Sequence, residues 1–203
     1  MGNEVKCVAR IAGKLDEGKA LLETSELIFR GAKCRVKILF SNIKSVTVAD
    51  GELRIKAQTG DHAFELGRAA EKWREKILHP KTRVEKLGVK AGMRVAMLGE
   101  PAAEFLKELK KSKAAITDGS ADANAGLIFW FVDRKGGLSG APRIAKKLQS
   151  AAGLWIVYPK GKKEIAENDV LAAGRKAGLK DLKVVGFSPT HTALKFVIPL
   201  EKR

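Results

Sequence analysis

Two continuous apolar segments constrain the fold of this chain more than any other feature. LIFWFV covers residues 127–132, and GLWIVYP covers residues 153–159. Neither segment alternates apolar and polar residues, so neither can leave one face of a strand in water. Such segments are typical of central parallel strands that are covered on both faces. The C-terminal part of the chain is therefore predicted to be an α/β domain built around these two strands.

Strand and helix patterns alternate along the rest of this part. Strands are predicted at 94–98, 114–117, 181–188 and 193–200, and helices at 102–111, 141–152 and 165–178. This alternation predicts a parallel sheet. The last two strands are joined by the short segment Pro189-Thr190-His191-Thr192 and are expected to form a hairpin, which makes the final strand antiparallel to the others.

The N-terminal part, residues 1–80, has a different pattern. Seven short segments with β-branched or alternating apolar residues are separated by turn signals, and Asp50-Gly51 is the strongest hairpin signal among them. The spacing of apolar residues then changes to that of a helix in the segment RAAEKWREKIL. Trp73 lies on the apolar face of this predicted helix, which ends before Pro80. The chain is thus predicted to have two domains, residues 1–80 and 81–203.

Seven strands followed by one helix resemble the pleckstrin-homology (PH) and GRAM modules. In this resemblance Trp73 is the residue of the final helix that plugs the open end of the barrel. The resemblance implies a PH-like β-barrel and a possible role in contacting a protein partner. Lipid-binding members need a basic first hairpin loop, and we place that loop at Lys14-Leu15-Asp16-Glu17-Gly18-Lys19. Its two acidic residues argue against phosphoinositide binding.

The net charge of +16 favours anionic partners. Residues 1–80 contribute +4 and residues 81–203 contribute +12, so the excess belongs to the C-terminal part. The two cysteines make no CxxC pair, which favours a reducing cytoplasm. No apolar stretch reaches the roughly 18 to 20 residues of a membrane span, and the N-terminus shows no signal peptide. A cytoplasmic protein is therefore expected.

The order of elements in the C-terminal part resembles a truncated class I methyltransferase fold, which is Rossmann-like. Residues from Lys86 to the end also resemble a bacterial family known as domain of unknown function 3052. The matching blocks are 86–93, 127–131, 153–160 and 177–179 with Lys183. This resemblance covers more than half of the chain and implies a fold, but it implies no activity.

Ligands of open α/β sheets bind outside the carboxyl ends of the parallel strands. The residues at these predicted ends form one edge, which we call the sheet rim. Tyr158 and Lys160 end one central strand, and Pro159 stops its hydrogen-bond ladder because it has no N–H. His191 is the only histidine of this part and is a candidate acid–base group. The candidate ligand-binding residues are Gly99, Glu100, Asp118, Asp133, Tyr158, Lys160 and His191.

Methyl transfer would need a glycine-rich turn after the first strand and an acidic residue after the second. The turn here has one glycine, Gly99, followed by Glu100, and Asp118 is the candidate ribose ligand. The connection from Lys111 to Gly126 is short and irregular for a full strand–helix–strand unit. No P-loop, HExxH, GxSxG or paired-cysteine pattern is present either. We therefore expect no catalytic residues, no metal site and no cofactor.

Four functions remain open from the sequence. The first is a non-catalytic binding or regulatory module that recognises an anionic, nucleotide-like small molecule at the sheet rim. The second is a nucleic-acid-binding protein that uses the basic C-terminal domain, although no recognition-helix or RRM pattern is present. The third is an S-adenosylmethionine-dependent methyltransferase, and the fourth is a scaffold that presents the PH-like domain to a protein partner. The patterns indicate no oligomeric state.

Overall fold

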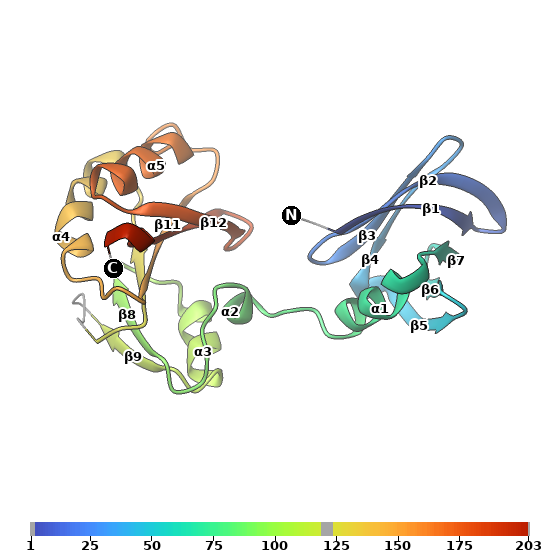
Figure 1. Cartoon of the computed structure of the whole chain (residues 1–203), viewed down its shortest axis with the longest axis horizontal. Coiled ribbons are helices and arrows are strands. Elements are labelled where there is room, and N and C mark those ends of the chain that lie inside the picture. Colours follow the sequence, from blue (N-terminus) through green and yellow to red (C-terminus); the bar gives the residue numbers. More distant parts are fainter. Residues whose placement is uncertain (1–2, 119–123, 203) are drawn as a thin grey trace. The chain divides into compact units, whose positions relative to one another are not determined.

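The structure is a computed structural model that describes residues 3–118 and 124–202. The chain divides into two compact units, residues 1–81 and 82–203, and each is built on its own sheet (Figure 1). None of the described helices is long and apolar enough to cross a membrane.

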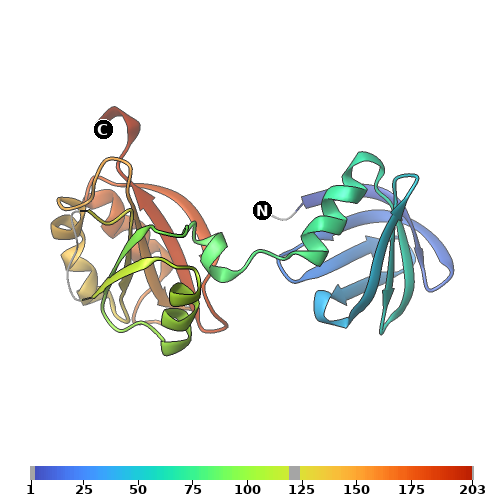
Figure 2. The same ribbon diagram turned by 90° about the horizontal axis from the view of Figure 1, so that it is seen from below.

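The first unit is a seven-stranded antiparallel sheet in the order β4-β3-β2-β1-β7-β6-β5. Its strands are β1 (Asn3–Ile11), β2 (Lys14–Leu22), β3 (Glu26–Gly31), β4 (Arg35–Leu39), β5 (Ile43–Ala49), β6 (Glu52–Ala57) and β7 (Gly60–Glu65). The sheet is curled, as Figure 2 shows from a second direction. Helix α1 (Ala70–Leu78) follows and packs against β5 and β6. The seven strands and the one helix predicted for this part are all present.

The core of this unit lies inside the curl of the sheet. Phe29 and Phe64 have no exposed surface, and their ring centroids lie 5.9 Å apart. Trp73 of α1 is 1% exposed and belongs to the same apolar cluster. The helical spacing that placed Trp73 in the core is thereby confirmed.

The first hairpin turn lies before the segment in which the sequence analysis placed it, and that prediction was wrong. Ala12 and Gly13 both have positive φ, +47° and +85°, and form the turn between β1 and β2. Lys14 to Lys19 are strand residues. Asp16 is therefore buried, and its Oδ2 accepts hydrogen bonds from the backbone N–H groups of Lys33 and Cys34 at 2.9 and 2.8 Å. The turn was missed because an alanine at positive φ is uncommon.

The second unit contains a six-stranded sheet in the order β12-β13-β11-β10-β8-β9. The strands are β8 (Arg94–Leu98), β9 (Ala115–Asp118), β10 (Leu127–Phe131), β11 (Gly153–Pro159), β12 (Lys180–Gly186) and β13 (His191–Val197). Strands β9, β8, β10 and β11 pair in parallel, and β13 is antiparallel to both β11 and β12. The predicted parallel sheet with an antiparallel last strand is confirmed.

Helices cover both faces of this sheet. Helices α4 (Ala141–Ala145) and α5 (Glu167–Lys176) lie on one face, where Ile144 and Val170 pack on Ile128 and Leu154. Helices α2 (Arg83–Lys86) and α3 (Ala103–Lys111) contribute to the apolar cluster on the other face, which includes Trp155. This double coverage explains why the central strands β10 and β11 are apolar along their whole length.

Several boundaries differ from those predicted, and two of the differences concern the region of the predicted site. The helix predicted over residues 141–152 ends at Ala145 and is preceded by a 3-10 turn over Lys135–Gly140. His191 was predicted to lie in the hairpin turn, but it is the first residue of β13, opposite Pro159 of β11. Asp118 is the last residue of β9, and the segment that follows it, 119–123, lies outside the described residues.

Candidate functional site

The sheet rim brings together four strand ends. Glu100 follows β8, Asp133 follows β10 and Lys160 follows β11, while His191 begins the antiparallel strand β13 on the same edge. Parallel pairing of β8, β10 and β11 places their carboxyl ends side by side. The rim therefore has the position predicted from the sequence.

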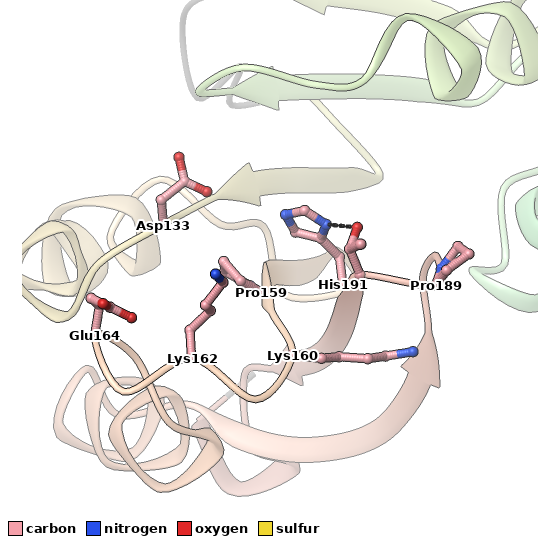
Figure 3. A pocket seen from close by; sticks show the side chains of 8 residues that line it. Asp133, Pro159, Lys160, Lys162, Glu164, Pro189 and His191 are labelled. Carbon is pink, nitrogen blue, oxygen red and sulfur yellow. Dashed lines mark hydrogen bonds between the residues drawn. The ribbon is translucent and has the colours of Figure 1, made fainter.

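A pocket of about 540 Å³ opens at the part of the rim formed by β10, β11 and β13 (Figure 3). We call it the rim pocket. Its volume lies in the range of roughly 300 to 1,000 Å³ that is usual for small-molecule sites. Its lining consists of Asp133, Pro159, Lys160, Lys162, Glu164, Pro189, Thr190 and His191. Three of the predicted site residues, Asp133, Lys160 and His191, thus line one pocket.

The two lysines of the pocket have different roles. The ammonium group of Lys160 donates a hydrogen bond of 2.8 Å to the carbonyl of Ser188 and points away from Asp133 in Figure 3. The side chain of Lys162 points toward the space beside Asp133 and His191. No ion pair or hydrogen bond holds its ammonium group among the described residues. Lys162 is therefore the pocket lysine that is directed toward a ligand and has no partner among the described residues.

Lys162 lies on a short loop that is held at both ends. The N–H of Lys160 donates to the carbonyl of Thr190 at 2.8 Å, and the N–H of Lys135 donates to the carbonyl of Glu164 at 2.9 Å. The ammonium group of Lys135 also pairs with Asp169 at 2.6 Å. These contacts limit the movement of the loop, so the position of Lys162 is partly organised before a ligand binds.

His191 has one ring nitrogen engaged within the protein. Its Nδ1 is 2.9 Å from Oγ1 of Thr190, and its backbone N–H donates to Oγ of Ser188 at 3.0 Å. No described residue forms a hydrogen bond with Nε2. The neighbouring hydroxyl orients the ring and leaves Nε2 to donate to, or accept from, a bound molecule.

The pocket also contains two carboxylates, Asp133 and Glu164. Neither side chain has an ion-pair partner among the residues that the structure describes. The pocket is therefore of mixed charge. Lys162 offers a positive charge, Nε2 of His191 offers a hydrogen-bonding nitrogen, and the carboxylates offer acceptors for hydroxyl or amino groups. Within the described ranges, no cluster of three or more His, Cys, Asp or Glu side chains could hold a metal ion.

Gly99 has a structural role at the end of β8. Its φ is +86°, and a Cβ at this position would lie 2.7 Å from the carbonyl oxygen of Phe131 in β10. The glycine therefore permits a left-handed turn against the neighbouring strand. Such a turn leaves the backbone of Gly99 and Glu100 exposed at the rim.

Three of the predicted site residues, Gly99, Glu100 and Tyr158, do not line the rim pocket. Gly99 and Glu100 lie at the end of β8, and Asp118 ends β9, but the side chain of Asp118 lies outside the described part. Tyr158 is only 3% exposed and belongs to the core, where its hydroxyl donates to Glu167. Burial and the Glu167 charge together raise the pKa of this phenol well above its usual value.

Lys162 and Glu164 were not among the site residues predicted from the sequence. The only signal was the cluster of charged residues directly after the Pro159 strand end. Rim positions were taken at the strand ends themselves, whereas these two side chains come from the loop that follows β11.

No protein-family model and no curated protein sequence matches this chain. Solved structures that this chain resembles include an S-adenosylmethionine-dependent methyltransferase from Aquifex aeolicus, which is 18% identical in sequence. The alignment covers 57% of this chain and 87% of that chain, with a TM-score of 0.46. An O-methyltransferase from Thermotoga maritima covers 87% of this chain and 94% of its own, at 9% identity and a TM-score of 0.44. A TehB-like methyltransferase from Corynebacterium glutamicum is 12% identical in sequence. Its alignment covers 64% of this chain and 96% of that chain, with a TM-score of 0.40. At these TM-scores the similarity carries no conclusion about activity.

Proposed function

We propose that the second unit is a binding or regulatory module that holds a small nucleotide-like anion in the rim pocket. The observation that carries this proposal is the ammonium group of Lys162, which has no partner in the described structure and lies in a pocket beside His191. A charged group without a partner at the carboxyl edge of a parallel sheet is suited to hold the anionic part of a ligand.

The two kinds of charge in the pocket suit two parts of such a ligand. Lys162 and Nε2 of His191 would bind a phosphate or carboxylate group. Asp133 and Glu164 would accept hydrogen bonds from ribose hydroxyls, as acidic residues do in dinucleotide-binding sheets. A simple anion would use only the first pair and would be repelled by the second. The pocket therefore favours a nucleotide-like molecule over an inorganic anion.

A thermal-shift panel tests this proposal. A ligand that binds only the folded state raises the melting temperature. We expect AMP or ADP to raise it, and we expect the Lys162→Met variant to lose the effect. Lys163→Met is the matched control, because Lys163 is its neighbour in the chain and does not line the pocket. Equal shifts in both variants would refute binding at the rim pocket.

A methyltransferase is the second candidate, and the strand order favours it. In class I methyltransferases an antiparallel strand is inserted beside the fifth parallel strand, and here β13 lies between β11 and β12 in that way. Gly99 directly follows β8 and Asp118 ends the adjacent strand β9, where a bound S-adenosylmethionine would lie. These residues fit a cofactor site only in part. The close approach to Phe131 already accounts for the glycine at position 99, and the side chain of Asp118 lies outside the described part. A melting shift with S-adenosylmethionine that Glu100→Ala removes would favour this candidate.

Four further assignments are proposals as well. The resemblance to domain of unknown function 3052 rests on the sequence blocks. A PH-like assignment of the first unit is supported by its curled sheet and its terminal helix, with Trp73 in the core. A protein partner of that unit and nucleic-acid binding by the second unit are alternatives, and a shift seen only with short single-stranded DNA and removed by salt would support the latter.

A further inference from the structure

Two lysines face each other across the β12–β13 pair. Lys183 of β12 is directly opposite Lys195 of β13. Like charges directly opposite each other on neighbouring strands are destabilising. Neither ammonium group has an ion-pair partner among the described residues. The fold therefore holds two positive charges on neighbouring strands without a carboxylate partner among the described residues, and this arrangement calls for an explanation other than stability.

The side chain of Lys195 runs through a space that the fold leaves for it. A Cβ on Gly153 would lie 2.6 Å from Cε of Lys195, so the absence of a side chain at Gly153 makes room for this lysine. Its Nζ lies 5.8 Å from the centroid of the Trp155 ring, whose Nε1 donates to the carbonyl of Leu87 at 3.0 Å. The lysine is thus held in place by packing.

Burial lowers the pKa of the Lys195 ammonium group below its usual value, and the charge of Lys183 lowers it further. The Nζ of Lys183 donates to the carbonyl of Lys86 at 3.0 Å, which leaves two of its three N–H donors available. The charge of Lys195 is therefore partly removed from water, which strengthens its attraction for an anion.

We propose that Lys183 and Lys195 form a binding site for a phosphate group, in which the Lys195 side chain is supported by the buried Trp155 ring. A phosphate monoester carries a charge of about −1.5 to −2 near neutral pH, which matches two ammonium groups. A phosphodiester of nucleic acid carries only one charge per group, so a free phosphate or a small phosphate ester suits the site better. This site lies beside Gly153, at the opposite end of β11 from Pro159 and the rim pocket, ~20 Å away by strand length.

The site is tested by melting curves of the full chain at constant ionic strength, with inorganic phosphate replacing chloride. We expect phosphate to raise the melting temperature of the wild type and of Lys110→Met, an exposed lysine on α3. Lys195→Met keeps the apolar chain over Gly153 and Trp155 but lacks the charge. It is expected to melt at or above the wild-type temperature in chloride and to gain clearly less from phosphate than the wild type, because only the general stabilising effect of phosphate remains. Lys183→Met is expected to show the same reduced gain.

Several outcomes would overturn the site. These are an absent phosphate effect in the wild type, an equal effect in wild type and Lys195→Met, or an effect lost only in Lys162→Met. The last result would place phosphate in the rim pocket and would refute the Lys183–Lys195 site, whereas the proposed function is decided separately by its own test with AMP or ADP. A ten-nucleotide single-stranded DNA in place of phosphate separates the two sources, and a shift with DNA but none with phosphate would also refute the proposal.

Discussion

The hydroxyl of Tyr158 donates a hydrogen bond of 3.2 Å to Oε2 of Glu167 at the start of α5. The phenol is buried, so this contact joins the end of β11 to the helix instead of facing a ligand. Tyr158→Phe removes one hydrogen bond and keeps the ring. We expect it to lower the free energy of unfolding by about 1 kcal/mol, measured by urea denaturation.

The same variant separates a structural role of Tyr158 from a binding role. If Tyr158 acts only in the core, Tyr158→Phe binds every ligand of the rim pocket as the wild type does, within a factor of about two. A tenfold loss of affinity at unchanged stability, which corresponds to about 1.4 kcal/mol, would return Tyr158 to the site.

Gly99→Ala tests the turn at the end of β8. The new Cβ would meet the carbonyl of Phe131 and would hold an alanine at positive φ. We expect a loss of about 2 kcal/mol in the free energy of unfolding, since strained φ values and overpacking each cost about 1 to 3 kcal/mol. Gly136→Ala is the control, because a Cβ there meets no atom within 4 Å and its φ is not positive. A neutral Gly99→Ala would contradict the close approach.

The buried side chain of His62 is expected to make the stability of the first unit depend on pH. The side chain is 3% exposed, its Nε2 is 3.0 Å from Oγ1 of Thr59, and its buried Nδ1 has no partner among the described residues. Burial lowers the pKa of this imidazole below its ordinary value, and the effect of Asp61 in the opposite direction is smaller. The unfolded chain therefore binds the proton more readily than the folded unit.

Stability that depends on neutral His62 is fully present above the unfolded pKa of about 6.5 and falls as the pH drops from there toward the lowered folded-state pKa. We expect urea titrations followed by NMR signals of β6 and β7 to show this decline. His62→Leu should flatten the decline over this range. The exposed His79 is the control, and His79→Gln should leave the decline unchanged. A wild-type unit equally stable at pH 7 and pH 5 would contradict the account.

At Gly174 of α5, side-chain packing and helix propensity predict opposite effects of an alanine substitution on the free energy of unfolding. Alanine is favoured over glycine by about 1 kcal/mol within a helix. A Cβ at this position would overlap the ring of Phe196 in β13. We expect the overlap to win and Gly174→Ala to lower the free energy of unfolding by about 1 to 2 kcal/mol. A stabilised variant, measured by urea denaturation, would mean that α5 can move away from the sheet at little cost.

Much of the fold could be predicted because its signals are local. The apolar segments 127–132 and 153–159 correspond to β10 and β11, and the helical spacing of Trp73 placed it in the core. The first hairpin turn could not be placed in the same way. It depends on Ala12 in a backbone conformation that alanine seldom adopts, and a more conventional turn signal lay nearby.

The site could be predicted only as a region. Strand ends place Asp133, Lys160 and His191 on one edge, and that much follows from the order of elements. The direction of each side chain depends on contacts distant in sequence. The ammonium group of Lys160 turns toward the carbonyl of Ser188. The side chain of Lys162 therefore takes the place at the pocket that was predicted for Lys160. Such contacts have no signature in the local sequence.

The most direct test of the central proposal is isothermal titration of ADP into the wild type, Lys162→Met and Lys163→Met at fixed ionic strength. The account predicts binding to the wild type, at least a tenfold weaker affinity for Lys162→Met, and near wild-type affinity for Lys163→Met. Loss of a charge-assisted hydrogen bond to a phosphate explains the expected difference. No heat of binding to the wild type, or equal affinities in the two variants, would contradict the assignment of the rim pocket as the ligand site.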